Sequence, residues 1–179
     1  MHKCISPFKS TYMSSVSRWD DYGQLSKIPQ LAYFCHMFSK TFGYALRAAT
    51  FISIHGIKGN KVSLLGLSQS LDIPHHFLGK IMQDLVRHGI IDSIKGPSGG
   101  FYANDRTAQT HLIDILVITD GSLVFSQCAL NIKRCNSEHP CPLHHDFAVC
   151  RDGMLKVMAE KTVAMLADTV ELGEVFLVR

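Results

Sequence analysis

The segment CALNIKRCNSEHPCPLHH, residues 128–145, concentrates side chains that can bind a metal. Its three cysteines and three histidines are Cys128, Cys135, Cys141, His139, His144 and His145. Three thiolates with an imidazole can hold zinc, a [2Fe-2S] cluster, or a [4Fe-4S] cluster whose fourth ligand comes from elsewhere. The same cysteines could instead be redox-active thiols without any metal.

The spacing of these cysteines favours a cluster over zinc but leaves both open. Structural zinc sites usually contain closely spaced cysteine pairs, whereas Cys128, Cys135 and Cys141 are separated by six and then five residues. Such long separations are typical of a loop that wraps around a larger inorganic core. We therefore expect an iron-sulfur cluster, either [2Fe-2S] or [4Fe-4S], with zinc and metal-free redox thiols as alternatives.

The rest of the chain indicates a soluble, cytoplasmic protein. No apolar run reaches the roughly 18 residues that a membrane helix needs, and the N-terminus lacks the apolar core of a secretory signal. A disulfide framework is not expected without export. Two of the six cysteines, Cys4 and Cys35, lie far from the others, and the clustering of the remaining four favours metal or redox chemistry.

The charge is unevenly distributed, which suggests two halves with different tasks. Residues 37–106 contain eight Lys/Arg against four Asp/Glu, whereas residues 107–179 contain six against nine. The basic half is a weak indication of nucleic-acid binding and needs a supporting fold. Residues 1–36 show no sustained periodicity and are expected to be a poorly structured extension.

Three amphipathic helices are predicted in the basic half. The first runs through SKTFGYALRAATFISIH and can end at Gly56, and the second can begin at Ser63. After a break at residues 72–74, the third runs through HHFLGKIMQDLVRHG and can end at Gly89. The second and third helices with their short turn predict a helix-turn-helix, in which the latter enters the DNA major groove.

The outward positions of the third helix carry polar side chains suited to DNA. They are His75, His76, Lys80, Gln83 and Arg87, with Asp84 as the acidic exception. Lysine and arginine can bind phosphates or guanine edges, and glutamine can bind an adenine edge. The alternative is an ordinary solvated helix face.

The sequence IIDSIKGPSGGFYAN predicts a β-hairpin directly after this helix, with its turn at residues 96–100. A hairpin in this position is a wing. Glycines at its tip allow a close approach to DNA, so we expect contacts from Lys95, Ser98 and Gly99. A purely structural hairpin is the alternative. The predicted fold is mainly α with a small β-hairpin: a winged helix-turn-helix domain over residues 37–106.

The acidic half, residues 107–179, is predicted to contain a connecting helix with Thr110 as a possible N-cap, the ligand segment, and a long C-terminal helix. The apolar positions of that last helix are Phe147, Met154, Leu155, Met158, Met165 and Leu166. A small winged domain could not cover this stripe alone, so we expect a homodimer, with intramolecular core packing as the alternative. A twofold dimer predicts an imperfectly palindromic DNA site.

The motifs SKTFGYALRA, IPHHFLGKIMQDLVRHGII and IKGPSGGFYAN, together with the downstream cysteines, resemble the Rrf2 family of bacterial transcription regulators over residues 38–176. The resemblance implies a dimer of winged helix-turn-helix domains, with Lys95 at the wing position where such proteins carry an arginine. Lysine lacks the planar guanidinium, so recognition of a narrow minor groove is expected to be weaker.

The same resemblance implies ligands for an iron-sulfur cluster. Cys128, Cys135 and Cys141 match the three cysteine ligands, and His144 matches the histidine of IscR-type members. The first gap is six residues where that pattern has five, which makes Cys150 a competing fourth ligand. NsrR-type members use an acidic residue where this chain has Gly43, which disfavours their ligand set.

These expectations combine into a regulator whose operator binding depends on a cluster that senses iron, redox state or nitric oxide. Repression is the usual outcome in similar proteins. A winged-helix regulator that binds zinc, or responds through metal-free thiols, is the alternative. No nucleophile with a neighbouring base and no nucleotide-binding loop occurs, so we do not expect an enzyme.

Overall fold

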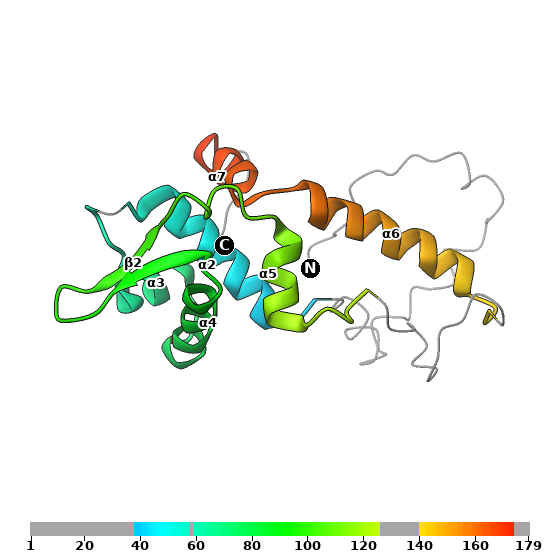
Figure 1. The fold of residues 1–179 in the computed structure, drawn as a ribbon, viewed down its shortest axis with the longest axis horizontal. Helices are drawn as coiled ribbons and strands as arrows, with labels where there is room; N and C mark the ends of the chain where they lie inside the picture. Colours follow the sequence, from blue (N-terminus) through cyan, green and yellow to red (C-terminus); the bar gives the residue numbers. More distant parts are fainter. Residues whose placement is uncertain (1–37, 58, 126–139, 174–179) are drawn as a thin grey trace, which may run out of the picture. The chain divides into compact units, whose positions relative to one another are not determined.

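The computed structural model describes residues 38–57, 59–125 and 140–173. Within these ranges the chain forms six helices and a two-stranded antiparallel sheet (Figure 1). Their bounds are α2 Lys40–His55, α3 Leu64–Leu71, α4 His75–Arg87, β1 Ile91–Ile94, β2 Gly100–Ala103, α5 Leu112–Asp120, α6 His144–Glu160 and α7 Val163–Glu171. The predicted mainly α fold with a small hairpin is confirmed. The extension predicted over residues 1–36 lies outside the described residues.

Helix α2 begins and ends where its sequence predicts. The Ser39 hydroxyl accepts a hydrogen bond from the Phe42 amide at 3.0 Å and thereby caps the N-terminus. At the other end, the Gly56 amide donates to the Ile52 carbonyl at 2.8 Å. A Cβ at position 56 would lie 2.9 Å from that carbonyl oxygen, so glycine is required there. None of the described helices is both long and apolar enough to cross a bilayer.

The predicted helix-turn-helix is formed by α3 and α4. Ser63 caps α3 by accepting from the Gly66 amide at 3.0 Å. The chain then turns through Asp72, which adopts a left-handed conformation with φ of 49°, and Pro74 precedes the first residue of α4. The Ser68 hydroxyl donates to the Ile73 carbonyl at 2.6 Å across this turn. These local contacts fix the direction in which α4 leaves α3.

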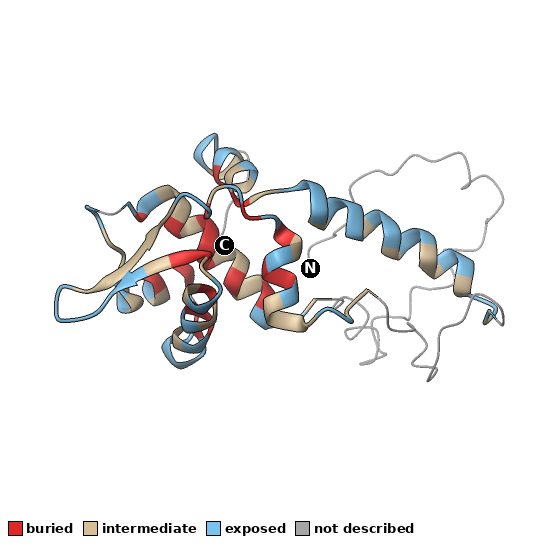
Figure 2. Cartoon of the chain, viewed as in Figure 1, coloured by how far each residue is buried: buried red, intermediate tan, exposed pale blue. Residues whose placement is uncertain are grey.

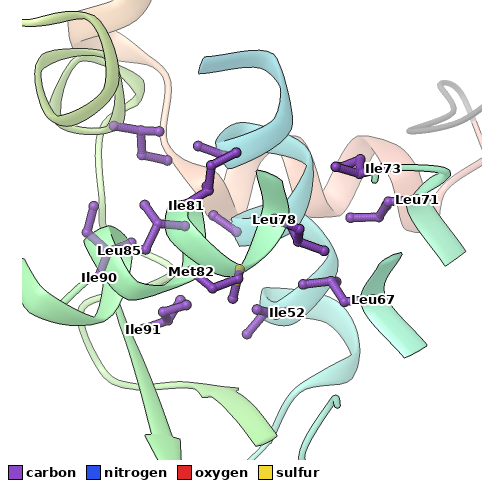
Figure 3. Close-up of a cluster of buried hydrophobic side chains, with 14 of the residues drawn as sticks. Ile52, Leu67, Leu71, Ile73, Leu78, Ile81, Met82, Leu85, Ile90 and Ile91 are labelled. Atoms are coloured by element: carbon purple, nitrogen blue, oxygen red, sulfur yellow. The ribbon is translucent and has the colours of Figure 1, made fainter. Parts of the chain in front are cut away.

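Helix α4 buries one apolar stripe in the core. The stripe consists of Leu78, Ile81, Met82 and Leu85, which Figure 3 shows among side chains of α2, α3 and β1. The same core contains Ile115 and Leu116 of α5 and Val163 of α7. Because α2, α3, α5 and β1 all pack against α4, the helix has one fixed rotation about its axis.

The wing is an antiparallel pair in which Ile91 lies opposite Ala103 and Ile94 opposite Gly100. A third segment extends the pairing, since the amide and carbonyl of Val62 both bond to Phe101, at 2.9 and 2.8 Å. No local pattern predicts that contact. The base of the wing is therefore held by the loop before α3.

A buried hydrogen-bond network joins the wing to the end of α4. The Thr107 hydroxyl is fully buried, donates to the Ile90 carbonyl at 2.6 Å and accepts from the Asn104 amide at 2.9 Å. The Asn104 side chain donates to the Gly89 carbonyl and the Asp92 carboxylate, each at 3.3 Å. Gly89 has φ of +70°, which suits a glycine at the end of a helix. The wing and α4 are thus fixed to each other by polar contacts.

The predicted single C-terminal helix is wrong, because it breaks at Lys161 and Thr162. Thr162 caps α7 through a bond from the Met165 amide at 3.4 Å. This stretch also pairs with the residues before α5: the Leu112 amide donates to Lys161, and the Val163 amide to Thr110, each at 3.0 Å. The chain forms this pairing in place of a continuous helix, and α7 packs against α2.

Two smaller expectations about this region are also corrected. Since Met165 and Leu166 belong to α7, they do not extend the apolar stripe of α6. Thr110 is not the N-cap of α5, because that helix begins after His111 and the Thr110 hydroxyl donates to the Arg106 carbonyl at 2.8 Å. The Asp114 carboxylate accepts from the His111 amide at 3.3 Å and so provides a hydrogen-bond partner for the N-terminus of α5.

The network at Thr107 predicts a measurable stability effect. Thr107→Val keeps the shape but removes the hydroxyl, which leaves the Ile90 carbonyl without its donor. We expect the free energy of unfolding to fall by about 1–3 kcal/mol, measured by urea denaturation. Thr41→Val, at an exposed position, is the matched control. Equal midpoints for the two variants would contradict this account.

Candidate nucleic-acid interface and ligand segment

The five predicted DNA-facing residues of α4 share one exposed surface. Burial of the apolar stripe turns the opposite side of the helix to solvent, as Figure 2 shows. His75, His76, Lys80, Gln83 and Arg87 are all exposed and line one shallow depression together with Leu64 of α3. The structure thus brings together the residues that the sequence predicts on one helix face.

Asp84 shapes the charge of this surface. Its carboxylate lies 3.3 Å from the Arg87 guanidinium, one helical turn away, and the Arg87 side chain is 71% exposed. An exposed pair of this kind contributes little to stability. It does hold the guanidinium against the helix and reduces the positive charge of the face. Lys80 has no acidic partner in the part of the chain that the structure describes.

The tip of the wing depends on two glycines. Gly96 has φ of +117°, and the Gly99 amide donates to the Gly96 carbonyl at 2.9 Å. A Cβ at position 99 would collide with the Ile94 carbonyl oxygen, so no other residue fits this turn. Lys95 precedes this turn and Ser98 lies within it; both are exposed, and Gly99 is half-buried. The tip therefore offers a narrow backbone with one cationic side chain.

Only part of the ligand segment lies within the described residues. Cys128, Cys135 and His139 lie outside them. Cys141 is half-buried with a free thiol, and the His144 amide donates to the Cys141 carbonyl at 3.0 Å where α6 begins. This hydrogen bond closes a turn that holds a thiol and an imidazole three residues apart.

The remaining candidates near this turn differ in position. His145 is exposed, and its ring lies edge-on to that of His144 with 5.4 Å between centroids. Cys150, the competing fourth ligand, lies on α6 and is exposed. It lies about 9 Å further along the helix axis than His144, at six residues of 1.5 Å rise. A soft thiolate and an imidazole in one turn suit zinc or an iron-sulfur cluster.

One contact between the start of α2 and the end of α5 is not predicted by the sequence. The Asp120 carboxylate accepts from the Ser39 amide at 2.8 Å and from the Ser39 hydroxyl at 2.5 Å. The same hydroxyl caps α2 through Phe42. Asp120 is the last residue of α5. The contact therefore joins the end of α5 to the start of α2, the helix on which α4 packs.

Sequence comparison relates the chain to bacterial regulators. A model of the family described as "Rrf2: Iron-dependent Transcriptional regulator" matches residues 38–169. An HTH-type transcriptional regulator of Aquifex aeolicus is 29% identical over 111 residues, covering 61% of this chain and 76% of the relative. The HTH-type transcriptional regulator NsrR of Geobacillus kaustophilus is 25% identical over 126 residues, covering 70% of this chain and 85% of the relative.

Solved structures share the fold. CymR, described as the global cysteine regulator of B. subtilis, aligns with a TM-score of 0.61 and 19% identity over 73% of this chain and 95% of its own. IscR of T. potens aligns with a TM-score of 0.60 and 16% identity over 78% of this chain and 91% of its own. At this level of identity, the structures support the winged-helix architecture alone.

The contact between Ser39 and Asp120 predicts an energetic coupling. Ser39→Ala removes the hydroxyl donor and keeps the amide donor, whereas Asp120→Ala removes the acceptor of both. Because both variants lose the bond between hydroxyl and carboxylate, the double variant should lose less stability than the sum of the two single variants. We expect a coupling energy of about 1 kcal/mol from the double-mutant cycle, measured by chemical denaturation. Additive losses would mean that the two residues act independently.

Proposed function

The chain belongs to the Rrf2 family of transcriptional regulators, and we propose that it binds an operator through α4 and the wing under the control of an iron-sulfur cluster. The observation that carries this proposal is the exposed polar face of α4, fixed in rotation by its buried stripe and joined to the wing through Thr107. A helix with one such face has the geometry of a recognition helix in the major groove.

Different residues of α4 would contact different parts of the DNA. Lys80 and Arg87 are placed to contact phosphates or guanine edges, and Gln83 can form two hydrogen bonds with an adenine. His75 and His76 lie in the first turn, where recognition helices contact bases. Arg87 would leave Asp84 when it engages DNA, because a phosphate is the stronger competitor for an exposed guanidinium. Asp84 thus lowers the affinity for DNA of any sequence.

The wing would place Lys95 in the adjacent minor groove, with the backbone at Ser98 and Gly99 approaching a phosphate. The tight turn allows this approach because Gly99 carries no side chain. A lysine here contributes a point charge without the shape preference of arginine. We therefore expect modest preference for narrow A-tract grooves.

Helix α6 would form the interface of a homodimer. None of its residues is buried within the described part of the chain. Phe147, Met154 and Met158 are only half-buried along one stripe, and Leu155 beside them is 38% exposed. A second copy packed on this stripe would remove apolar surface from water. The resulting twofold axis requires an imperfectly palindromic operator, and occupancy of a promoter would repress it.

The ligands proposed for the cluster are Cys128, Cys135, Cys141 and His144. When bound, the cluster supplies a redox- and nitric-oxide-sensitive iron centre, most simply [2Fe-2S]. Cys141 and His144 would fix the first turn of α6, while the contact of Asp120 with Ser39 holds the end of α5, which precedes the segment, against α2. Ligation of both ends favours one arrangement of α6 relative to the DNA-binding helices. Its loss would change operator affinity by a typical allosteric factor of about 5–150.

The ligand assignment predicts a specific pattern among single variants. Protein purified without oxygen should absorb visible light and contain iron and sulfide, whereas Cys135→Ala should lose both. His144→Ala should shift the spectrum and release iron faster in air. His145→Ala and Cys150→Ala are the matched controls and should resemble the parent protein. A colourless, zinc-containing parent would instead favour the zinc alternative.

The recognition surface predicts separable effects on DNA binding. The operator would be isolated from genomic fragments with the anaerobically prepared protein, and affinities measured by fluorescence anisotropy at several salt concentrations. Lys80→Ala should weaken all sequences and reduce the slope of log K against log salt by about 1. Gln83→Ala should lose about 1–3 kcal/mol of discrimination at one adenine.

Gln109→Ala provides the control for the second variant, because Gln109 is an exposed glutamine outside α4. Its operator affinity should equal that of the parent. Loss of binding by Gln109→Ala, or unchanged specificity of Gln83→Ala, would place base recognition elsewhere.

A further inference from the structure

A groove on the flank of α4 is separate from the depression on its outward face. It lies where the start of α2, the side of α4 and the end of α5 meet, and it has a volume of about 560 Å³. The residues that matter most in it are Lys40, Tyr44, Phe77, Lys80, Ile81 and Ile118. This volume lies within the range typical of small-molecule sites. We call it the α2–α4–α5 groove.

One side of the groove is apolar and partly open to solvent. Phe77 is 56% exposed, and its ring contacts the His76 ring with centroids 4.2 Å apart. Ile118 and Tyr44 are half-buried, and Ile81 is almost completely buried. A large aromatic side chain exposed in a concave surface is suited to stack against a planar apolar group.

The other side of the groove carries positive charge. Neither Lys40 nor Lys80 forms an ion pair with any described residue. The Tyr44 hydroxyl forms no hydrogen bond with any described residue. The acidic residue of the groove, Asp84, is engaged by Arg87 at 3.3 Å on the outward face. The charge therefore favours an anionic group next to an aromatic one.

We propose that the α2–α4–α5 groove binds a small organic anion with an aromatic ring, and that its occupancy competes with DNA. The ring would lie against Phe77 and Ile118, and the anionic group would face Lys40 and Lys80. Competition follows because His76 and Lys80 line both the groove and the outward depression of α4. An anion that engages Lys80 removes a cation from the DNA-binding surface.

This ligand would provide a second input to the regulator. The binding of the anion is independent of the proposed function, whereas its competition with DNA rests on that function. The two claims are measured in different experiments, so a failure of one is distinguishable from a failure of the other.

The first experiment uses 8-anilinonaphthalene-1-sulfonate, a fluorescent aromatic anion, with the full-length protein in the absence of DNA. We expect saturable fluorescence with one site per chain. N-phenyl-1-naphthylamine has the same ring system without the sulfonate and should bind at least about fivefold more weakly, as expected for loss of a hydrogen-bonded charge. Equal affinity for the two probes would overturn the assignment of charge recognition to Lys40 and Lys80.

Matched variants locate the probe. Phe77→Ala should weaken the sulfonate probe by about tenfold or more through lost aromatic contact. Leu65→Ala removes a side chain of similar exposure, 59%, from α3 outside the groove and should have no effect. Lys40→Gln should weaken the probe, whereas Lys161→Gln, at another exposed lysine, should not. Equal effects of Phe77→Ala and Leu65→Ala would place the probe on another surface and overturn the proposal.

The second experiment adds the sulfonate probe to a complex of the protein with duplex DNA. The apparent dissociation constant for DNA should rise linearly with probe concentration, and the slope of this rise should be smaller in Lys40→Gln. As a control for folding, Phe77→Ala should have the same melting profile by circular dichroism as the parent, because position 77 is exposed. Simultaneous binding of probe and DNA without mutual effect would refute the competition.

Discussion

Burial of one apolar stripe on α4 determines the orientation of this helix and of the wing attached to it. Leu78, Met82 and Leu85 are completely buried, and truncating such a side chain typically costs about 2–5 kcal/mol. That cost prevents α4 from rotating about its axis. Every polar residue on the opposite side is consequently held outward together, and the wing, attached through Asn104 and Thr107, follows the same orientation. The proposed recognition surface is thus oriented by buried residues on the opposite side of α4.

Features encoded by neighbouring residues were predictable from the sequence. Ser63, Gly56 and Gly89 mark helix ends through their own capping and backbone preferences, and the turn at residues 96–100 requires glycine. The break at Thr162 was not predictable, since a helical pattern continues through it. It depends on pairing with Thr110 and Leu112, about fifty residues away, and such long-range backbone contacts leave no local periodicity.

The features of the candidate site likewise fall into those that local sequence predicts and those that depend on long-range packing. The outward residues of α4 follow from helical spacing alone, and the pair of Asp84 with Arg87 could have been anticipated from its three-residue separation. The contact of Ser39 with Asp120 spans 81 positions and depends on how α2 and α5 pack. Membership in a family of transcriptional regulators confirms the expectation that the chain is not an enzyme.

Helix α7 has an implication for how the molecule could be divided. Its Val163 and Ala167 are buried, the former within the core that α4 shares, and its start is paired with the residues preceding α5. A fragment cut off after the wing would leave the surface of α2 that α7 covers open to water. The winged helix-turn-helix is therefore not an autonomous module. A truncation near the C-terminus that removes α7 would destabilise α2, although α2 lies much earlier in the chain.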